Sequence, residues 1–100
     1  NTCINNGQLG IFLMFYNSDN LIANNTCSSN QDSGIGLLIS DNNKIEGNTC
    51  SKNSWVGIDL RYSDHNKVFN NISTDNVGGI RLENSNHNII VVNPKIWTPM

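Results

Sequence analysis

Four charged side chains are the candidates for acid–base chemistry in this sequence. They form two pairs of opposite charge, Asp59 with Arg81 and Arg61 with Glu83, and the members of each pair lie 22 positions apart. In an enzyme, Asp59 could act as a general base while an arginine holds a sugar carboxylate through two parallel hydrogen bonds. Neighbouring arginines, however, lower the pKa of a carboxyl group, whereas a general base needs a pKa near neutrality. We therefore favour a structural role as exposed ion pairs.

Two histidines are the candidate metal ligands. His65 and His87 occupy equivalent positions 22 residues apart, and Asp64 precedes His65. Two neighbouring imidazoles could share a transition metal. A metal site also needs a third ligand and a second shell of hydrogen bonds, and Asp64 should point away from its neighbour in the chain. We therefore favour a solvated turn, and we predict neither a bound metal nor a cofactor.

Apolar side chains that could stack on sugar rings form a third candidate site. They are Phe12, Met14 and Trp55, with Leu38 and Tyr16 close to them in the repeat described below. A sizeable exposed apolar patch usually marks an interface. We therefore favour the alternative, that a partner or residues outside this sequence cover the patch.

Three cysteines recur at one position of the repeat. They are Cys3, Cys27 and Cys50, and Ser73 takes the fourth place. Side chains stacked in one column run parallel, whereas a disulfide needs a dihedral near 90°. The odd number and the lack of a C-x-x-C spacing also argue against a disulfide or zinc framework. We predict three reduced, buried cysteines without metal, unless Ile72 rather than Ser73 points inward and shifts the column.

The composition limits the elements that can position these groups. The 100 residues include 20 Asn and 12 Ile but only one Ala, two Gln and two Glu. Because the best helix formers are scarce, a helical bundle is excluded. The net charge of −2 argues against nucleic acid or an anionic membrane as a partner, and no apolar run is long enough to insert into a membrane.

Internal repeats dominate the sequence. Units begin at Asn1, Asn25, Asn48 and Asn71, and a fifth start follows at Asn93, with spacings of 22 to 24 residues. Each unit repeats a "G-I-x-L" motif, at 10–13, 34–37, 57–60 and 79–82, and later an "N-x-I/V" motif. Length differences fall between these landmarks, as expected if the landmarks are strands.

Each unit predicts three short strands separated by Asn, Asp, Ser and Gly. In the second unit, Ile35, Leu37 and Ile39 alternate and should share one face. Three strands per unit, stacked in register, form an all-β parallel β-helix, and the rule for parallel crossovers makes it right-handed. We assign 1–93 to this β-helix of about four coils and 94–100 to a C-terminal tail, either a linker or a partial cap.

Asparagine columns have a structural explanation in such a stack. Asn tolerates left-handed backbone conformations at bends, and stacked Asn side chains can hydrogen-bond to one another. The two columns expected to do so are Asn25, Asn48, Asn71 and Asn93, and Asn20, Asn43, Asn66 and Asn88.

The stretch "NNTCSSNQDSGIGLLISDNNKIEGNTCSKN" at 24–53 resembles the right-handed β-helix repeats of the NosD-like and "carbohydrate-binding and sugar hydrolase" class, which has a pectin-lyase-like fold. The resemblance implies a periplasmic, cell-surface or secreted location and a polysaccharide partner. It also implies that the outward face of the longest strand is the usual substrate side. Asp59, Arg61, Arg81 and Glu83 would then lie on that face beside Phe12 and Met14.

The first interpretation of function is a non-catalytic scaffold or polysaccharide-binding module. The chain starts within a repeat and has no signal peptide, so we expect it to be a fragment whose partners include neighbouring coils of a longer protein. One alternative is a polysaccharide lyase, epimerase or hydrolase, with its site at Asp59 or in coils outside this sequence. The other is a copper-handling periplasmic protein like the one that gives the family its name.

Overall fold

Three parallel sheets enclose one core in the computed structural model, which describes residues 1–91. The first sheet contains β1 (Thr2–Ile4), β4 (Thr26–Ser28), β7 (Thr49–Ser51) and β10 (Ile72–Thr74). The second contains β2 (Ile11–Met14), β5 (Ile35–Leu38), β8 (Val56–Arg61) and β11 (Gly78–Glu83). The third contains β3 (Leu21–Ala23), β6 (Lys44–Glu46), β9 (Lys67–Phe69) and β12 (Ile89–Val91). The described chain is therefore all-β, with three strands in each coil.

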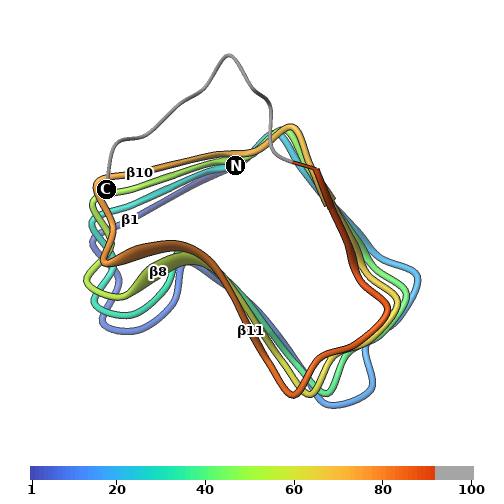
Figure 1. Ribbon diagram of the computed structural model, residues 1–100. Helices are drawn as coiled ribbons and strands as arrows, with labels where there is room; N and C mark the ends of the chain where they lie inside the picture. Colours follow the sequence, from blue (N-terminus) through green and yellow to red (C-terminus); the bar gives the residue numbers. More distant parts are fainter. Residues whose placement is uncertain (92–100) are drawn as a thin grey trace.

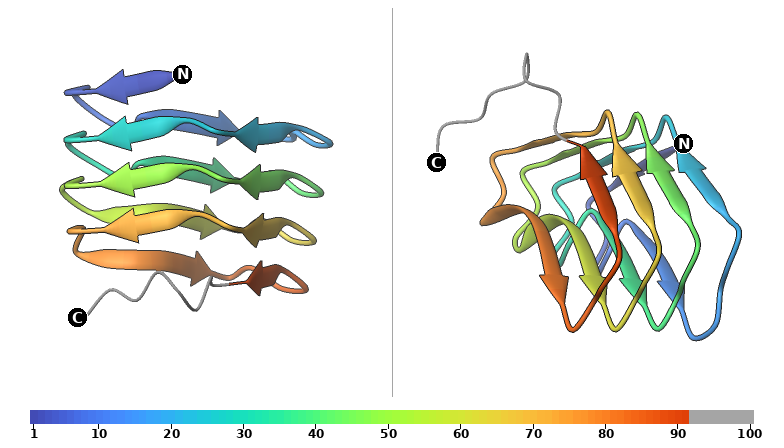
Figure 2. Two further views of the ribbon diagram at one scale, coloured as in Figure 1. Left: turned by 90° about the horizontal axis from the view of Figure 1, so that it is seen from above. Right: turned by 45° about the vertical axis from the view of Figure 1, so that its right-hand side comes forward.

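The coils stack as the repeat predicts. We call residues 1–24 coil 1, 25–47 coil 2, 48–70 coil 3 and 71–91 coil 4, and every sheet takes one strand from each coil (Figure 1; Figure 2). In Figure 1 the chain runs anticlockwise as it comes toward the viewer, so the coil is right-handed. The Cα partners join equivalent residues, for example Ile35 with Ile58 and Ile58 with Ile80. The prediction of a right-handed parallel β-helix is confirmed.

The core is a set of four inward columns, one each from the first and third sheets and two from the second. Its fully buried members are Cys27, Ile35, Leu37, Ile45, Cys50, Ile58, Leu60 and Val68. Period-two alternation places every second strand residue in this interior. Because the coils are thin, one or two side chains per strand are enough to fill the interior.

The cysteine column is in register. Cys3 pairs with Cys27, Cys27 with Cys50, and Cys50 with Ser73, so the shift toward Ile72 does not occur. All three cysteines are free thiols. Cys27 and Cys50 are buried as predicted, but the prediction for Cys3 was wrong, because coil 1 has a neighbour on only one side and leaves this side chain half-buried.

Each bend combines a left-handed residue with a ladder residue. Asn24, Asn42 and Asn70 have φ between 56° and 59°, and each directly precedes an Asn of the predicted columns. Those following asparagines form the ladder: Asn48 Oδ1 accepts from the backbone N–H and from Nδ2 of Asn25, both at 2.9 Å. We expected one asparagine to supply both the left-handed bend and the ladder hydrogen bond. In the structure, two consecutive residues supply them.

The long strand of coil 2 is shorter than its alternation indicated. β5 ends at Leu38, and Ile39 has a φ of 52° in the bend, so its predicted place on the inward face was wrong. Its counterparts Phe15 and Tyr62 have φ values of 65° and 50° and are more than half exposed. The predicted tail at 94–100 lies outside the described residues.

Candidate functional site

The outward face of the second sheet brings the predicted sugar-binding and acid–base residues together. Strand alternation leaves two outward columns on this face. Register places Phe12, Gly36, Asp59 and Arg81 in one of them and Met14, Leu38, Arg61 and Glu83 in the other. The face is therefore apolar on coil 1 and charged on coils 3 and 4.

Asp59 is the centre of the charged half. Its carboxylate accepts hydrogen bonds from Nε and Nη2 of Arg81, at 2.9 and 3.0 Å, across neighbouring coils. The Asp59 side chain is only 4% exposed, although it lies on the outward side of the sheet. The expectation of exposed ion pairs was therefore wrong for this residue, and both of its oxygens are engaged.

Arg61 does not pair with the residue that the sequence suggested. Glu83 is its Cα partner on the next coil, yet the Arg61 guanidinium turns along its own strand, with Nε 3.5 Å from Oδ2 of Asp59. Glu83 instead lies 3.2 Å from Nη2 of Arg81. Among the described residues, the buried Nε of Arg61 has no hydrogen-bond partner. The Arg61 side chain as a whole is 34% exposed.

Trp55 adds an aromatic ring to this group. It lies in the bend before β8, and the guanidinium of Arg81 sits 5.4 Å from the centre of its ring. Such a contact is an attractive cation–π interaction. The hydrogen bonds to Asp59, together with the negative charges of Asp59, Glu83 and Asp32, raise the pKa of Arg81. Arg81 is therefore a permanent cation held between a carboxylate and an exposed indole.

The apolar half of the face is open to solvent. Phe12 is 36% exposed and Met14 is 45% exposed, so neither is covered by the described chain. The side chain of Leu9 occupies the space that a Cβ at Gly36 would need, which leaves no room for a larger residue there. Phe12 and Met14 thus lie on one outward face, with Leu9 packed against Gly36, and Trp55 lies in the bend beside Arg81 of the same face.

The two histidines are neighbours, as their column predicts. The rings of His65 and His87 stack with centroids 5.1 Å apart and planes at 5°. Both are exposed bend residues with positive φ, a conformation in which His, Asn and Asp are enriched. Asp19 and Asn42 fill the same place on coils 1 and 2 with φ values of 60° and 59°. The bend geometry by itself explains why a residue of this kind occupies the column.

The arrangement of the rings does not fit a bound metal ion. The lone pair of an imidazole lies in the ring plane, so two parallel rings do not direct their lone pairs at a common point. Within residues 1–91, no third His, Cys, Asp or Glu completes a group that could hold a metal.

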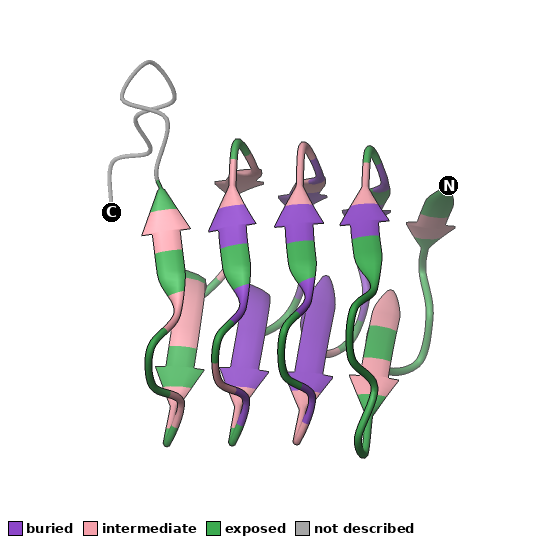
Figure 3. Cartoon of the chain, turned by 90° about the vertical axis from the view of Figure 1, so that its right-hand side faces the viewer, coloured by how far each residue is buried: buried purple, intermediate pink, exposed green. Residues whose placement is uncertain are grey.

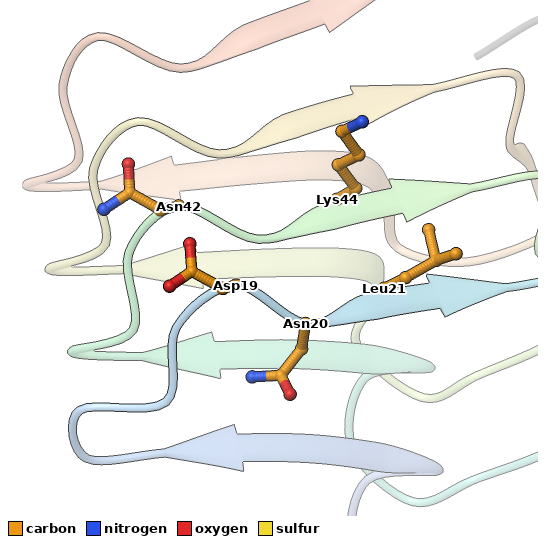
Figure 4. Close-up of a pocket in the computed structure, with 5 residues that line it drawn as sticks. All are labelled: Asp19, Asn20, Leu21, Asn42 and Lys44. Carbon is orange, nitrogen blue, oxygen red and sulfur yellow. The ribbon is translucent and has the colours of Figure 1, made fainter.

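A hollow on the third sheet was not found from the sequence. It encloses about 340 Å³ between coils 1 and 2 and is lined by Asp19, Asn20, Leu21, Asn42 and Lys44 (Figure 4). Leu21 and Lys44 are Cα partners, and Figure 4 shows them beside each other on β3 and β6. The only signal in the sequence was a column in which lysine replaces leucine, and this does not by itself indicate a hollow.

Comparison with known proteins identifies the family. Residues 1–94 match the family model described as periplasmic copper-binding protein (NosD). The chain belongs to the NosD family. No curated protein and no solved structure matches this chain. The NosD match and the parallel β-helix together confirm the resemblance seen in the repeats. The described part of the chain contains no helix long and apolar enough to cross a membrane.

Proposed function

We propose that this NosD-family chain is a non-catalytic β-helix module that binds polysaccharide on the outward face of its second sheet, outside the cytoplasm. The observation that carries the proposal is the group formed by Trp55, Arg81 and Asp59. An exposed indole offers a flat apolar surface to a sugar ring, and a fixed guanidinium beside it can donate hydrogen bonds to hydroxyl or carboxylate groups. The periplasmic description of the family supports the location.

Exposed side chains extend this surface along the sheet. Phe12 and Met14 lie on coil 1 of the same face, and they are more than a third exposed. Consecutive coils of a β-sheet repeat at about 4.8 Å, so the distance from coil 1 to coil 4 is about 15 Å. A surface of that length suits a chain of several sugar units better than a single small molecule.

The state of Asp59 supports binding rather than catalysis. A general base must reach a substrate proton through a free oxygen. Both Asp59 oxygens accept hydrogen bonds from Arg81, and its side chain is nearly inaccessible to solvent.

Titration calorimetry with oligosaccharides tests this proposal. The ligands are a neutral glucan oligomer and a uronic-acid oligomer, and we expect the uronic-acid oligomer to bind more tightly because Arg81 is cationic. Trp55→Ala should weaken binding by about tenfold, the loss of one aromatic stacking contact. Phe69→Ala is the matched control, because this half-buried aromatic lies on β9 of the third sheet. Equal affinities of the two variants, or no binding by the unchanged protein, would contradict the proposal.

An assay for turnover distinguishes the binding module from the enzyme alternative. Incubation of the protein with uronic-acid polymers should produce no new reducing ends and no unsaturated products. Turnover that disappears in Asp59→Ala but persists in the control Glu46→Ala, a half-buried carboxylate on β6 of the third sheet, would show that the protein is an enzyme and not a binding module.

Copper handling is the second candidate. The family description names copper, and the exposed imidazoles of His65 and His87 are adjacent. Against it stand the parallel ring planes and the lack of a third ligand among the described residues. Titration with Cu(I) and with Cu(II) decides the matter. Binding that is lost in the double variant His65→Asn with His87→Asn, and retained in Lys44→Ala with Lys67→Ala, would establish this candidate.

A further inference from the structure

We propose that the stacked thiols of Cys27 and Cys50 bind one soft univalent cation, Cu(I), in a linear site inside the coil. The two residues are Cα partners on β4 and β7, and both side chains are fully buried. Their sulfur atoms therefore follow one another along the axis of the stack, in the inward column of the first sheet. The inference is independent of the sugar-binding face, because it concerns the core and not an outward surface.

The spacing of the coils suits two metal–sulfur bonds in line. Neighbouring strands of a sheet lie about 4.8 Å apart, and residues in register repeat at that distance. A metal–thiolate bond is about 2.3 Å long, so two such bonds in a straight line span about 4.6 Å. A cation midway between the two sulfur atoms would consequently bond to both without any change in the register of β4 and β7.

The parallel course of the two side chains also suits this geometry. A disulfide needs its sulfur atoms about 2 Å apart and a dihedral near 90°, which neighbours in one column do not provide. A bridging cation has no such requirement, because each thiolate bonds sideways, roughly at a right angle to its Cβ–Sγ bond. The imidazoles of His65 and His87 differ in this respect, since the lone pairs of stacked rings do not meet at one point.

The two thiols are close enough to share a proton. Their hydrogen bond lowers the pKa of Cys27 and raises the pKa of Cys50, as expected when a thiolate of Cys27 accepts from the thiol of Cys50. A cation takes the place of the shared hydrogen, and the protons of both thiols leave as the two metal–sulfur bonds form. The site therefore needs no cavity beyond the gap that the hydrogen bond occupies.

The surroundings favour a soft cation with few ligands. Thiolates are preferred ligands of Cu(I), which is stable with only two of them. Zn²⁺ instead takes four ligands, and among residues 1–91 no third His, Cys, Asp or Glu completes a group that could hold a metal. Ile35 on β5 and Ile58 on β8 belong to the same buried cluster as the two cysteines, and Figure 3 shows both strands buried along most of their length. Such an apolar shell excludes water from the cation.

The pair is bounded on both sides. On coil 4 the column continues with Ser73, whose hydroxyl is a poor ligand for a soft metal and donates to the carbonyl oxygen of Gly79 at 2.9 Å. On coil 1, Cys3 is only half-buried, so the gap between Cys3 and Cys27 is less well enclosed. We therefore assign one cation per chain to the gap between Cys27 and Cys50. The sequence alone did not indicate this site, because its ligands come from successive coils and not from a C-x-x-C motif.

Uptake of Cu(I) by the 100-residue protein tests the proposal. Cu(I) is added without oxygen to the native protein and, because both sulfur atoms are buried, also during refolding from denaturant. After gel filtration, native mass spectrometry should find one copper ion per chain, and the ultraviolet spectrum should gain a thiolate-to-copper band. A protein that retains no copper by either route, or that retains Zn²⁺ as readily, would overturn the proposal.

Variants locate the cation. Cys50→Ser should lose the bound copper, and serine fits this column because Ser73 occupies it on coil 4. Cys50→Ala removes the same ligand without adding a hydroxyl, should the serine variant unfold. Cys3→Ser is the matched control and should retain one copper ion, as should His65→Asn with His87→Asn. Copper that is retained by a folded Cys50 variant, or lost from Cys3→Ser, would place the metal elsewhere and overturn the assignment.

Discussion

The guanidinium of Arg81 binds the carboxylate of Asp59 through two hydrogen bonds, at 2.9 and 3.0 Å, and thereby joins coil 4 to coil 3. The pair is asymmetric: the Asp59 side chain is 4% exposed, and that of Arg81 is 35% exposed. The carboxylate has lost most of its water, so the protein must supply its partners. The contact therefore stabilises the junction between the two coils and also orients Arg81 toward Trp55.

Asp59→Asn is expected to lower the free energy of unfolding by about 1 to 2 kcal/mol. An amide retains one acceptor oxygen but loses the charge and one of the two charge-assisted hydrogen bonds. Chemical denaturation followed by circular dichroism measures the change. The control is Glu83→Gln, whose side chain is 43% exposed and whose ion pair should contribute under about 1 kcal/mol. Equal losses in the two variants would show that the burial of Asp59 has no energetic effect.

Asn48→Ala tests the ladder. Its side chain is fully buried, accepts from Asn25, and donates to the carbonyl oxygens of Ile22 and Glu46. Alanine would leave several buried groups without partners, and the expected loss of stability is about 2 to 4 kcal/mol.

The control for the ladder is Asn86→Ala, an exposed bend residue that contributes its backbone N–H to the hydrogen bond with Asp64. We expect a change of less than about 0.5 kcal/mol there. A similar result for the two asparagines would mean that the ladder does not hold the coils together.

Gly34→Ala tests how closely the coils approach. A Cβ at this position would lie 2.8 Å from the carbonyl oxygen of Gly57 and 3.0 Å from Nδ2 of Asn53. The backbone oxygen cannot rotate away, so the coils must separate locally at a cost of about 1 to 3 kcal/mol. Gly7→Ala is the control, because a Cβ added at Gly7 would meet nothing within 4 Å beyond its neighbours in the chain. Thermal unfolding compares the two, and a Gly34 variant as stable as the Gly7 variant would contradict the packing.

Ile39→Asn should stabilise the protein. Ile39 is β-branched and has a φ of 52°, a conformation that costs most residues about 1 to 2 kcal/mol. Asn84 already occupies this column on coil 4 with a φ of 48°. We expect a gain of about 1 kcal/mol in the free energy of unfolding. Ile39→Val retains the branch and the strain, so it should give no gain, and an Asn variant less stable than the Val variant would contradict the explanation.

The sequence predicts contacts between coils well because every strand repeats the same landmarks. Register and the partners in the two predicted asparagine columns follow from the positions of Gly34, Asn48 and their equivalents, and the hand follows from the rule for parallel crossovers. Predictions were wrong for residues whose side-chain direction or backbone conformation the repeat pattern does not determine. Arg61 turns toward Asp59 rather than Glu83 because its long side chain can reach both carboxylates. Ile39 lies in the bend with a positive φ, directly before Ser40, whose backbone N–H donates to Oγ of Ser63 on the next coil.

The sequence of a single repeat also does not show whether its coil lies at the end or in the middle of the stack. Cys3 and Cys27 both follow an Asn–Thr pair, yet of the two only Cys27 has a described coil on both sides. The same reason explains the exposure of Phe12 and Met14, which share columns with the buried Gly36 and the half-buried Leu38.

Thiol labelling distinguishes the cysteines by coil. At low protein concentration and without denaturant, Cys3 should react, while Cys27 and Cys50 should not, because both are fully buried. Burial and the neighbouring thiol of Cys27 raise the pKa of Cys3, so its reaction should be slow at neutral pH and accelerate as pH rises and the thiolate forms.

Two measurements complete the labelling test. The Cys3→Ser variant should lose the early reaction, and all three thiols of the unchanged protein should react in denaturant, since all are free. The hydrogen bond with Cys27, followed by burial, raises the pKa of Cys50, which protects it further in the native state. Early reaction of two or three thiols would place the column on the outside of the coil. If two thiols were missing after denaturation, a disulfide would have formed between neighbouring coils.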